Sequence, residues 1–273
     1  MCESTYLEIQ LPLSSSAPIA VPARHASRAG VKPRRAAPVF AVTSGKGGVG
    51  KTNVVANLAI ALSHLNQRVL AIDADLGLAN LDLLLGVRPT FTLADFFAGK
   101  AALDEIILTN QDGIWVMPGA NGVQAITSLS AEQKAALLTE LDLLTHEMDL
   151  VLVDTGSGIS DAVTYFTSAA QEIILVVTPE PAALTAAYAL VKVLLSQYRE
   201  RRFWVLANNV SDGEDARHLF NTLSRTALRF LNVSLDFLDW IPRDPRLLSA
   251  VARAQTVVGS DASVVTLNCS RTV

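Results

Sequence analysis

A glycine-rich pattern at residues 45–52 constrains the fold of this chain more than any other feature. The run Gly45-Lys-Gly-Gly-Val-Gly-Lys51-Thr52 fits the spacing G-x-x-x-x-G-K-[ST]. Such a loop works only between a strand and a helix, because its backbone N–H groups must close around an anion in front of the positive end of the helix. Residues 39–43 are apolar like a strand, and residues 49–65 have a helical pattern. The pattern therefore predicts a strand–loop–helix unit of an α/β fold.

The rest of the chain continues this alternation of short apolar runs with helical stretches. Further strands are expected at 68–73, 113–118, 149–154, 172–177, 203–208 and 235–241. Further helices are expected at 130–146, 159–169, 182–199, 213–229 and 244–254; the first is capped by Ser130, with Gln133 three residues on. Near-continuous apolar strands between helices indicate a mostly parallel sheet with helices on both faces.

One domain at 38–258 accounts for this pattern, and a segment of different composition flanks it on each side. Residues 1–37 are rich in Ala, Pro, Ser and Arg and lack periodicity, which is typical of a disordered tail. The alternative for this basic segment is a docking element for a partner or an acidic surface. Residues 259–273 are expected to form an irregular tail, and a truncated or frameshifted end is the alternative.

Composition narrows the class of protein. The net charge of −4 gives no overall attraction to nucleic acid or to an anionic membrane. The two cysteines, Cys2 and Cys269, form no metal-binding motif, so no zinc or iron–sulfur site is expected, and their scarcity fits a reducing cytoplasm. No signal peptide is recognisable. The most apolar stretch, 173–191, is interrupted by Pro179 and Pro181, so it predicts a strand, a turn and a helix instead of a membrane span.

The residue types of the loop indicate how it would hold a nucleotide. Its glycines let backbone N–H groups face phosphate oxygens, Lys51 neutralises β- and γ-phosphate charge, and the Thr52 hydroxyl is a ligand for Mg²⁺. The expected nucleotide contacts are Gly45, Lys46, Gly47, Gly48, Val49, Gly50, Lys51, Thr52 and Asn53. A glycine turn that binds nothing is the alternative. On spacing alone, Lys46 is a solvated charge.

Two acidic runs follow predicted strands, at the edge where an open α/β sheet binds its ligands. The first, 73–82, contains Asp75 and Asn80. The second, Leu150-Val-Leu-Val-Asp154-Thr-Gly-Ser-Gly, brings the Asp154 carboxylate toward the Mg²⁺ shell, with a water between them. The glycines that follow allow this loop to shift when a phosphate leaves. The alternatives are an Asp that caps a turn in the first run and an Asp that closes a buried strand in the second.

Lys46-Gly-Gly-Val-Gly-Lys-Thr resembles the deviant Walker A motif of the MinD/ParA/Mrp class of ATPases. The resemblance implies an ATP-dependent homodimer that hydrolyses ATP slowly, with stimulation by a partner. It implies that Lys46 reaches across the dimer to phosphates on the second chain, where a cation beside Lys51 offsets charge in phosphoryl transfer. It also implies that Asp75 positions or activates the attacking water, with Asn80 helping to orient it.

The end of the strand at 203–208 bears on which base is bound. The run Ala207-Asn208-Asn209-Val-Ser-Asp lacks the Asn-Lys-x-Asp signature of GTPases, which favours adenine. By resemblance to MinD-like proteins, Asn208 contacts the adenine, and Asn209 is the alternative. Pro242 lies in a run that resembles the segment on the other side of the base.

Several runs resemble the FlhG/FleN (YlxH) regulators of flagellar number more than MinD. They are Gly50-Lys-Thr-Asn-Val, Asp75-Leu-Gly-Leu-Ala-Asn-Leu-Asp-Leu-Leu-Leu-Gly, Asp154-Thr-Gly-Ser-Gly-Ile-Ser, Val177-Thr-Pro-Glu-Pro and Leu206-Ala-Asn-Asn-Val. The resemblance implies a role in flagellar number or placement. The implied partners are an FlhF-type GTPase, flagellar switch proteins or a flagellar transcription activator.

Two departures from the family's pattern limit these expectations. The family's N-terminal motif for the FlhF-type GTPase is not visible in residues 1–37, and the C-terminal run shows no amphipathic membrane-targeting face. Membrane binding is therefore not expected from that run. The alternatives are a ParA/MinD-like ATPase that positions another cargo, either DNA or a secretion or cellulose machine, and a nucleotide-binding scaffold without turnover. Direct DNA binding is not expected, because the core shows little basic surface.

Overall fold

The computed structural model describes residues 36–75, 79–119 and 130–244. Within them, one eight-stranded sheet has the order β3-β4-β2-β5-β1-β6-β7-β8. The strands are β1 (Val39–Ser44), β2 (Val69–Ala74), β3 (Leu108–Thr109), β4 (Trp115–Met117), β5 (Leu150–Ser157), β6 (Glu172–Val177), β7 (Trp204–Val210) and β8 (Asp236–Pro242). The helices are α1 (Lys51–His64), α2 (Leu81–Leu84), α3 (Leu93–Phe97), α4 (Leu103–Ile106), α5 (Ala131–Thr145), α6 (Asp161–Ser168), α7 (Pro181–Tyr198) and α8 (Gly213–Leu231). Only the β3–β4 pair is antiparallel, so the expected mostly parallel α/β fold is confirmed.

The long predicted elements lie close to their expected positions, whereas four short ones were not expected. The Ser130 cap is confirmed, because its hydroxyl accepts from the Gln133 N–H at 3.2 Å. The unexpected elements are α2, α3, α4 and β3, each of five residues or fewer. Ala37, assigned to the tail, is buried and donates its N–H to the Thr145 carbonyl at 3.3 Å. The helix expected at 244–254 and the rest of both tails lie outside the described residues.

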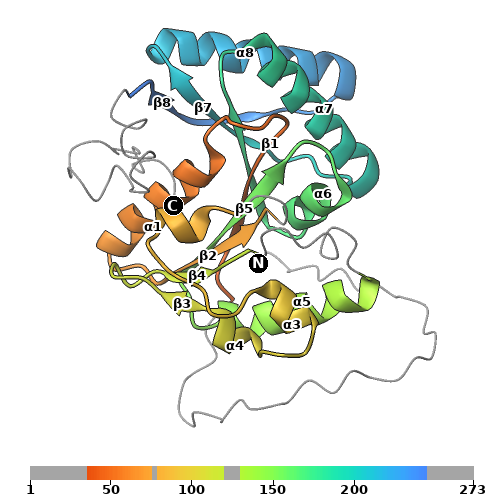
Figure 1. The fold of residues 1–273 in the computed structure, drawn as a ribbon. Coiled ribbons are helices and arrows are strands. Elements are labelled where there is room, and N and C mark those ends of the chain that lie inside the picture. Colours follow the sequence, from red (N-terminus) through yellow and green to blue (C-terminus); the bar gives the residue numbers. More distant parts are fainter. Residues whose placement is uncertain (1–35, 76–78, 120–129, 245–273) are drawn as a thin grey trace, which may run out of the picture.

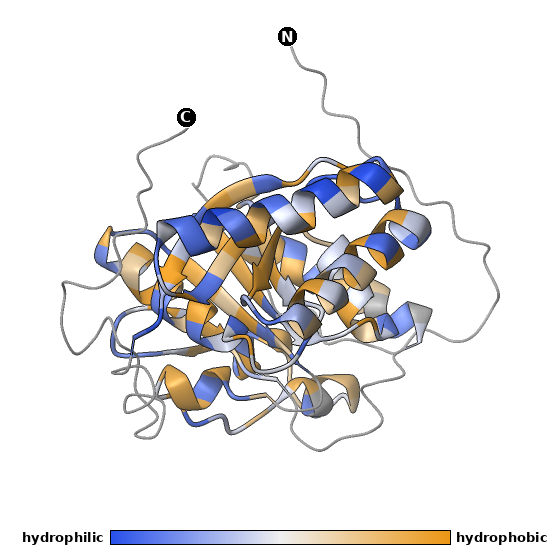
Figure 2. Ribbon diagram, turned by 90° about the horizontal axis from the view of Figure 1, so that it is seen from above, coloured by the Kyte–Doolittle hydropathy of each residue, from blue (hydrophilic) through white to orange (hydrophobic). Residues whose placement is uncertain are grey.

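Alternating side chains of the central strands supply the two faces of the sheet. In β2, Val69 and Ala71 pack in the cluster that includes α1, while Leu70 and Ile72 pack in the cluster that includes α5 and α6. Figure 1 shows α1 on one side of the sheet and α5, α6 and α7 on the other. In Figure 2 the hydrophobic residues gather in the strands and the inner helix faces, and the outer faces are hydrophilic. Both faces of the parallel sheet are therefore covered, as such a sheet requires.

The parallel register brings the ends of the central strands together at one edge. Asp73 of β2 lies opposite Asp154 of β5, and Ser44 of β1 lies opposite Ser157 of β5. On the other side, β1 pairs with β6, and β6 pairs with β7, which ends near Asn208. The glycine-rich loop leaves β1 between these neighbours, so the fold itself gathers the predicted site residues.

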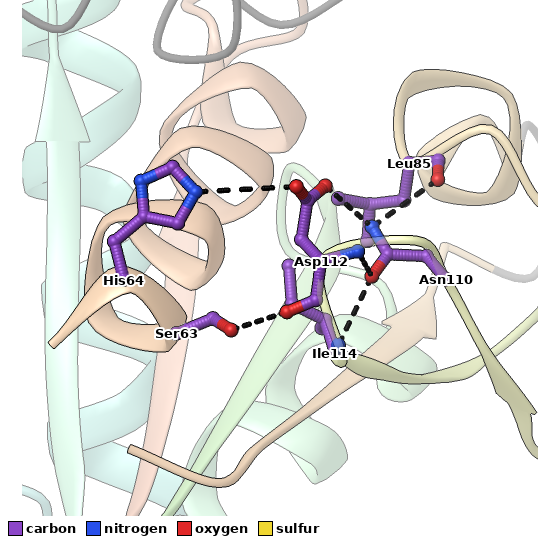
Figure 3. A network of polar contacts seen from close by, with 6 residues as sticks. All are labelled: Ser63, His64, Leu85, Asn110, Asp112 and Ile114. Carbon is purple, nitrogen blue, oxygen red and sulfur yellow. Dashed lines mark hydrogen bonds and ion pairs between the residues drawn. The ribbon is translucent and has the colours of Figure 1, made fainter. Parts of the chain in front are cut away.

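A polar network fastens the opposite end of α1 to the β3–β4 hairpin (Figure 3). The Asn110 side-chain oxygen accepts from the N–H groups of Asp112 and Ile114 at 2.9 and 3.0 Å, which closes the turn. The Ser63 hydroxyl donates to the Asp112 carbonyl. His64 Nε2 lies 3.9 Å from Asp112 Oδ1. The helix is thus anchored at its far end, while its N-terminus faces the loop.

Candidate nucleotide-binding site

The glycines of the glycine-rich loop have two different roles, which are to adopt positive φ angles and to allow close packing. Gly48 and Gly50 have φ angles of +75° and +93°, in the left-handed region that residues with a Cβ rarely adopt. Gly45 instead permits close packing, because a Cβ there would lie 2.0 Å from the Ala186 carbonyl oxygen of α7. The carbonyl of Gly50 accepts the first helical hydrogen bond, from the Val54 N–H at 3.0 Å. The loop is therefore held open between β1 and α1, with α7 against its first residue.

Lys51 begins α1 and is buried at 8% exposure. Its ammonium donates to the Ser44 hydroxyl at 3.0 Å, and that hydroxyl donates to the Lys46 carbonyl at 2.7 Å. Burial lowers the pKa of Lys51, while the charges of Asp154 and Asp75 act to raise it. A cation with so little solvent around it is ready to be neutralised by an anion such as phosphate.

Asp154 ends the apolar part of β5 and is 1% exposed. Burial raises its pKa to about 8, and the neighbouring Asp73 carboxylate acts in the same direction. A hydrogen bond from the Thr52 side chain and the charge of Lys51 act in the opposite direction. Asp154 Oδ1 has no hydrogen-bond partner among the described residues. The predicted Mg²⁺ residues Thr52 and Asp154 are thus side by side, with one buried acceptor unused.

Asp73 organises the first acidic run from within the core. Its carboxylate accepts from three backbone N–H groups, those of Asp75, Asn80 and Leu81, each at 3.0 Å. Burial raises the pKa of Asp73 to about 7, and these three hydrogen bonds limit the rise. Residues 76–78 lie outside the described part. The chain on either side of them, at Asp75 and at Asn80, donates backbone N–H groups to the Asp73 carboxylate.

The two acidic runs meet beside the loop. A Cβ on Gly156 would lie 3.5 Å from Asp75 Oδ1, within van der Waals contact, so the Asp75 carboxylate lies against the end of β5. The Gly158 N–H donates to the Ser44 carbonyl at 3.0 Å, which ties the second run to the end of β1. Asn80 precedes α2 with an exposed side chain. The structure therefore brings Asp75 to the centre of the site and leaves Asn80 at its rim.

The remaining predicted residues lie on two sides of the loop. The Lys46 ammonium forms an ion pair with Glu180, the residue before α7. Asn208 is buried and donates from Nδ2 to the Val49 carbonyl at 2.7 Å. Asn209 is exposed, and Pro242 lies across from Val210 in the β7–β8 pair. Asn53, in the first turn of α1, has a buried side-chain oxygen without a partner in the described residues.

Three residues contribute to the site although the motifs did not predict them. Ser44 and Glu180 are the partners of the two loop lysines, and Asp73 fastens the first acidic run. Ser44 and Asp73 adjoin recognised motifs, so the end of a buried strand was an available signal. Glu180 stands 134 positions from its partner, and nothing in the local sequence marks the pair.

The fold and the site together define a P-loop nucleotide-binding ATPase, and comparison with known proteins gives its family. Residues 40–257 match the family model described as "CobQ/CobB/MinD/ParA nucleotide binding domain". The chain therefore belongs to this family of MinD/ParA-type ATPases.

Within this family, the chain is similar to the antiactivator FleN of Pseudomonas aeruginosa, with 45% identity over 80% of this chain and 78% of that one. It is also 34% identical to the flagellum site-determining protein YlxH of Helicobacter pylori, over 69% of this chain and 63% of that one. Among solved structures it resembles MinD of Pyrococcus horikoshii complexed with Mg-ADP, at a TM-score of 0.65 and 26% identity over 83% of this chain and 90% of that one. The chain is a FleN/FlhG-type member of the MinD family.

Proposed function

We propose that this protein is a dimeric, slowly hydrolysing ATPase switch that regulates flagellar number or placement in bacteria. Its assignment to the FleN/FlhG type rests on the 45% identity to FleN across most of both chains. The observation that carries the ATPase chemistry is the packing of Lys51, Thr52 and Asp154 around one buried, unsatisfied carboxylate oxygen. A metal ion would satisfy this acceptor, and the phosphates of a bound nucleotide would accept from the Lys51 ammonium.

The residues at this point suit Mg²⁺. Asp154 Oδ1 is buried without a partner, and the Thr52 hydroxyl is adjacent. Within the described ranges, no group of three or more His, Cys, Asp and Glu side chains could hold a metal unaided. Thr52 would hold the ion directly and Asp154 through water, with nucleotide oxygens completing the shell. When bound, the ion would neutralise phosphate charge.

Residues of this chain would bind the phosphates, position the attacking water and contact the base. The loop N–H groups bind the phosphates, and Lys51 leaves the Ser44 hydroxyl to neutralise them. Asp75, which lies beside Gly156, positions or activates the attacking water, and Asn80 orients it from the rim. Asn208 and Pro242 would contact the adenine, with Asn209 as the alternative contact.

In the dimer that we propose, Lys46 acts on the nucleotide of the second chain. Its ion pair with Glu180 shows where the ammonium lies in a single chain, on the exposed side of the loop. A lysine in that position can leave for a neighbouring chain without disturbing the buried residues. The proposed homodimer therefore forms with ATP bound, and hydrolysis would release it.

The relatives' names suggest which partners bind the ATP-bound dimer. An antiactivator opposes an activator, so we propose a flagellar transcription activator as one partner, with an FlhF-type GTPase or flagellar switch proteins as others. No helix among the described residues is long and apolar enough to cross a membrane. We propose that the protein acts in the cytoplasm. It would bind transiently at the inner face of the cell membrane only through a partner.

The test has a biochemical arm and a cellular arm. Purified protein should hydrolyse ATP with Mg²⁺ and should form dimers with ATP but not with ADP when Asp75→Ala blocks turnover. Deletion of the gene should change the number or position of flagella per cell. An unchanged flagellar pattern, with ATPase activity intact, would favour another cargo.

A further inference from the structure

The side chain of Asn208 joins the end of β7 to the last peptide of the phosphate loop. Its Nδ2 donates to the Val49 carbonyl at 2.7 Å, and its Oδ1 accepts from the Asn209 N–H at 2.9 Å. Asn208 is 6% exposed and Val49 is 3% exposed. The hydrogen bond is therefore shielded from water, and the Asn209 N–H fixes which way the amide points.

The contact acts on a peptide unit that matters for phosphate binding. A trans peptide is planar, so its C=O and N–H point in opposite directions. When the Val49 carbonyl points toward Asn208, the Gly50 N–H points away from Asn208. The Gly50 carbonyl is engaged in α1 through the Val54 N–H at 3.0 Å. The orientation of Gly50 is thus defined on both sides.

The space around Gly50 confirms that the loop and the amide are in direct contact. A Cβ on Gly50 would lie 2.6 Å from Asn208 Nδ2, closer than real Cβ contacts come. Gly50 also has a φ of +93°, which a side chain would disfavour. The glycine therefore makes room for Asn208 as well as for the turn.

We propose that Asn208 is a positioning residue for the phosphate loop, which presets the Gly50 N–H toward bound phosphate whatever base the nucleotide carries. This inference rests on the proposed function of the loop as a nucleotide site. The amide keeps one N–H and one lone pair, so it can still contact a base. One side chain then links the phosphate and base subsites.

Two effects are expected from removing the Asn208 amide that the loss of a base contact alone would not produce. Removing the amide should weaken inorganic tripolyphosphate, which has no base, as well as ATP. One neutral hydrogen bond corresponds to an affinity change of roughly three- to tenfold. The loop should also become less protected from hydrogen exchange in the nucleotide-free protein, because its Val49–Gly50 peptide loses its tether.

The experiment compares Asn208→Ala, Asn208→Leu and the exposed control Asn221→Ala of α8 with the wild-type chain. Asn208→Leu keeps most of the side-chain volume, so it serves where Asn208→Ala loosens the fold, as monitored by thermal unfolding. Calorimetric titration with Mg²⁺-tripolyphosphate and Mg²⁺-ATP gives the affinities, and amide exchange of the nucleotide-free chain reports on residues 45–52.

We expect both Asn208 variants to lose affinity for the two ligands by a similar factor and to exchange faster at 45–52, with Asn221→Ala unchanged. Weaker ATP binding with tripolyphosphate affinity and loop exchange unaltered would overturn the inference and leave Asn208 as a base contact only. A wild-type chain that does not bind ATP would instead refute the proposed function. The exchange measurement needs no ligand and would still decide the role of Asn208.

Discussion

The ammonium of Lys46, the second residue of the phosphate loop, is paired with the carboxylate of Glu180, the residue that precedes α7. Both side chains are substantially exposed, at 40% and 54%. The pair holds within one chain the lysine that we propose to act on a second chain. In the dimer that we propose, Lys46 would leave Glu180, and this ion pair would break.

Neutralising Glu180 should favour the ATP-bound dimer. Exposed ion pairs contribute about 0.2–1 kcal/mol, and each of the two chains gives up one pair, so Glu180→Gln should strengthen dimerisation by roughly two- to thirtyfold in an Asp75→Ala background. Sedimentation equilibrium with ATP measures the dimer constant. Glu214→Gln, which removes an acid from the first turn of α8, is the matched control and should change nothing. A weaker dimer in Glu180→Gln would mean that Glu180 contributes to the interface.

Replacing Asp75 should stop turnover without preventing nucleotide binding. Its carboxylate lies beside Gly156, whereas the phosphate-binding groups belong to the loop. We expect Asp75→Ala to lower kcat by at least about a hundredfold, the lower end of the range for a lost general base, with ATP affinity within about threefold of wild type. Phosphate-release kinetics and equilibrium titration measure the two quantities separately. Hydrolysis at the wild-type rate would remove Asp75 from the mechanism.

The nucleotide-free protein should lose stability as the pH rises toward 8. The pKa of Asp154 is about 8 in the folded chain and near 3.8 when unfolded, so the folded state binds the proton more tightly. Its contribution to the free energy of unfolding is then largest below pH 4 and declines as pH rises through 8. Asp73, with a pKa of about 7, acts in the same direction.

Asp154→Asn removes one of these titrations and provides the test. At about 1.4 kcal/mol per pKa unit, wild type should lose about 4 kcal/mol relative to the variant between pH 5 and pH 8. Urea unfolding without nucleotide, at pH 5 and pH 8, measures the difference. Lys51, whose pKa is lowered by burial, acts in the opposite direction, because the folded state binds its proton less tightly than the unfolded state does. Equal gains at both pH values would contradict the burial argument.

A methyl group at Gly45 should damage the site through α7. It would lie 2.0 Å from the Ala186 carbonyl oxygen, and helix backbone cannot turn aside as a side chain can. We expect Gly45→Ala to cost about 1–3 kcal/mol of unfolding free energy and to abolish measurable ATP binding. Gly113→Ala, at a φ of +76° in open space, should lower stability by about 1 kcal/mol with ATP affinity intact. Preserved ATP binding in Gly45→Ala would show that the loop tolerates movement of α7.

The parts of the site that consist of residues adjacent in the sequence could be predicted from local motifs. Lys51 and Thr52 follow from one motif, and Asp154 follows from an apolar run that ends in a carboxylate. The long strands and helices followed from periodicity. Elements of four or five residues, such as α2 and α4, are too short to show a period, and their positions depend on tertiary packing.

The contacts that join distant segments could not be predicted in the same way. Lys46 and Glu180 are 134 positions apart, and Asn208 and Val49 are 159 positions apart. Neither pair is encoded by local spacing, since both depend on the order β1-β6-β7 in the sheet. The roles given to Asn80, Asn53 and Pro242 remain predictions that nucleotide-bound experiments can test.

The place of β1 in the sheet has a consequence for how the protein folds. Val39 pairs with Val151 of β5, and Phe40 pairs with Glu172 of β6, so both neighbours of β1 come from more than one hundred positions further along the chain. During synthesis the phosphate loop is made early but has no framework until those two strands have left the ribosome. Pairing across such distances is slow, because the loop-closure entropy is lost before the contacts form. ATP can therefore stabilise the phosphate loop only after the domain has assembled around β1.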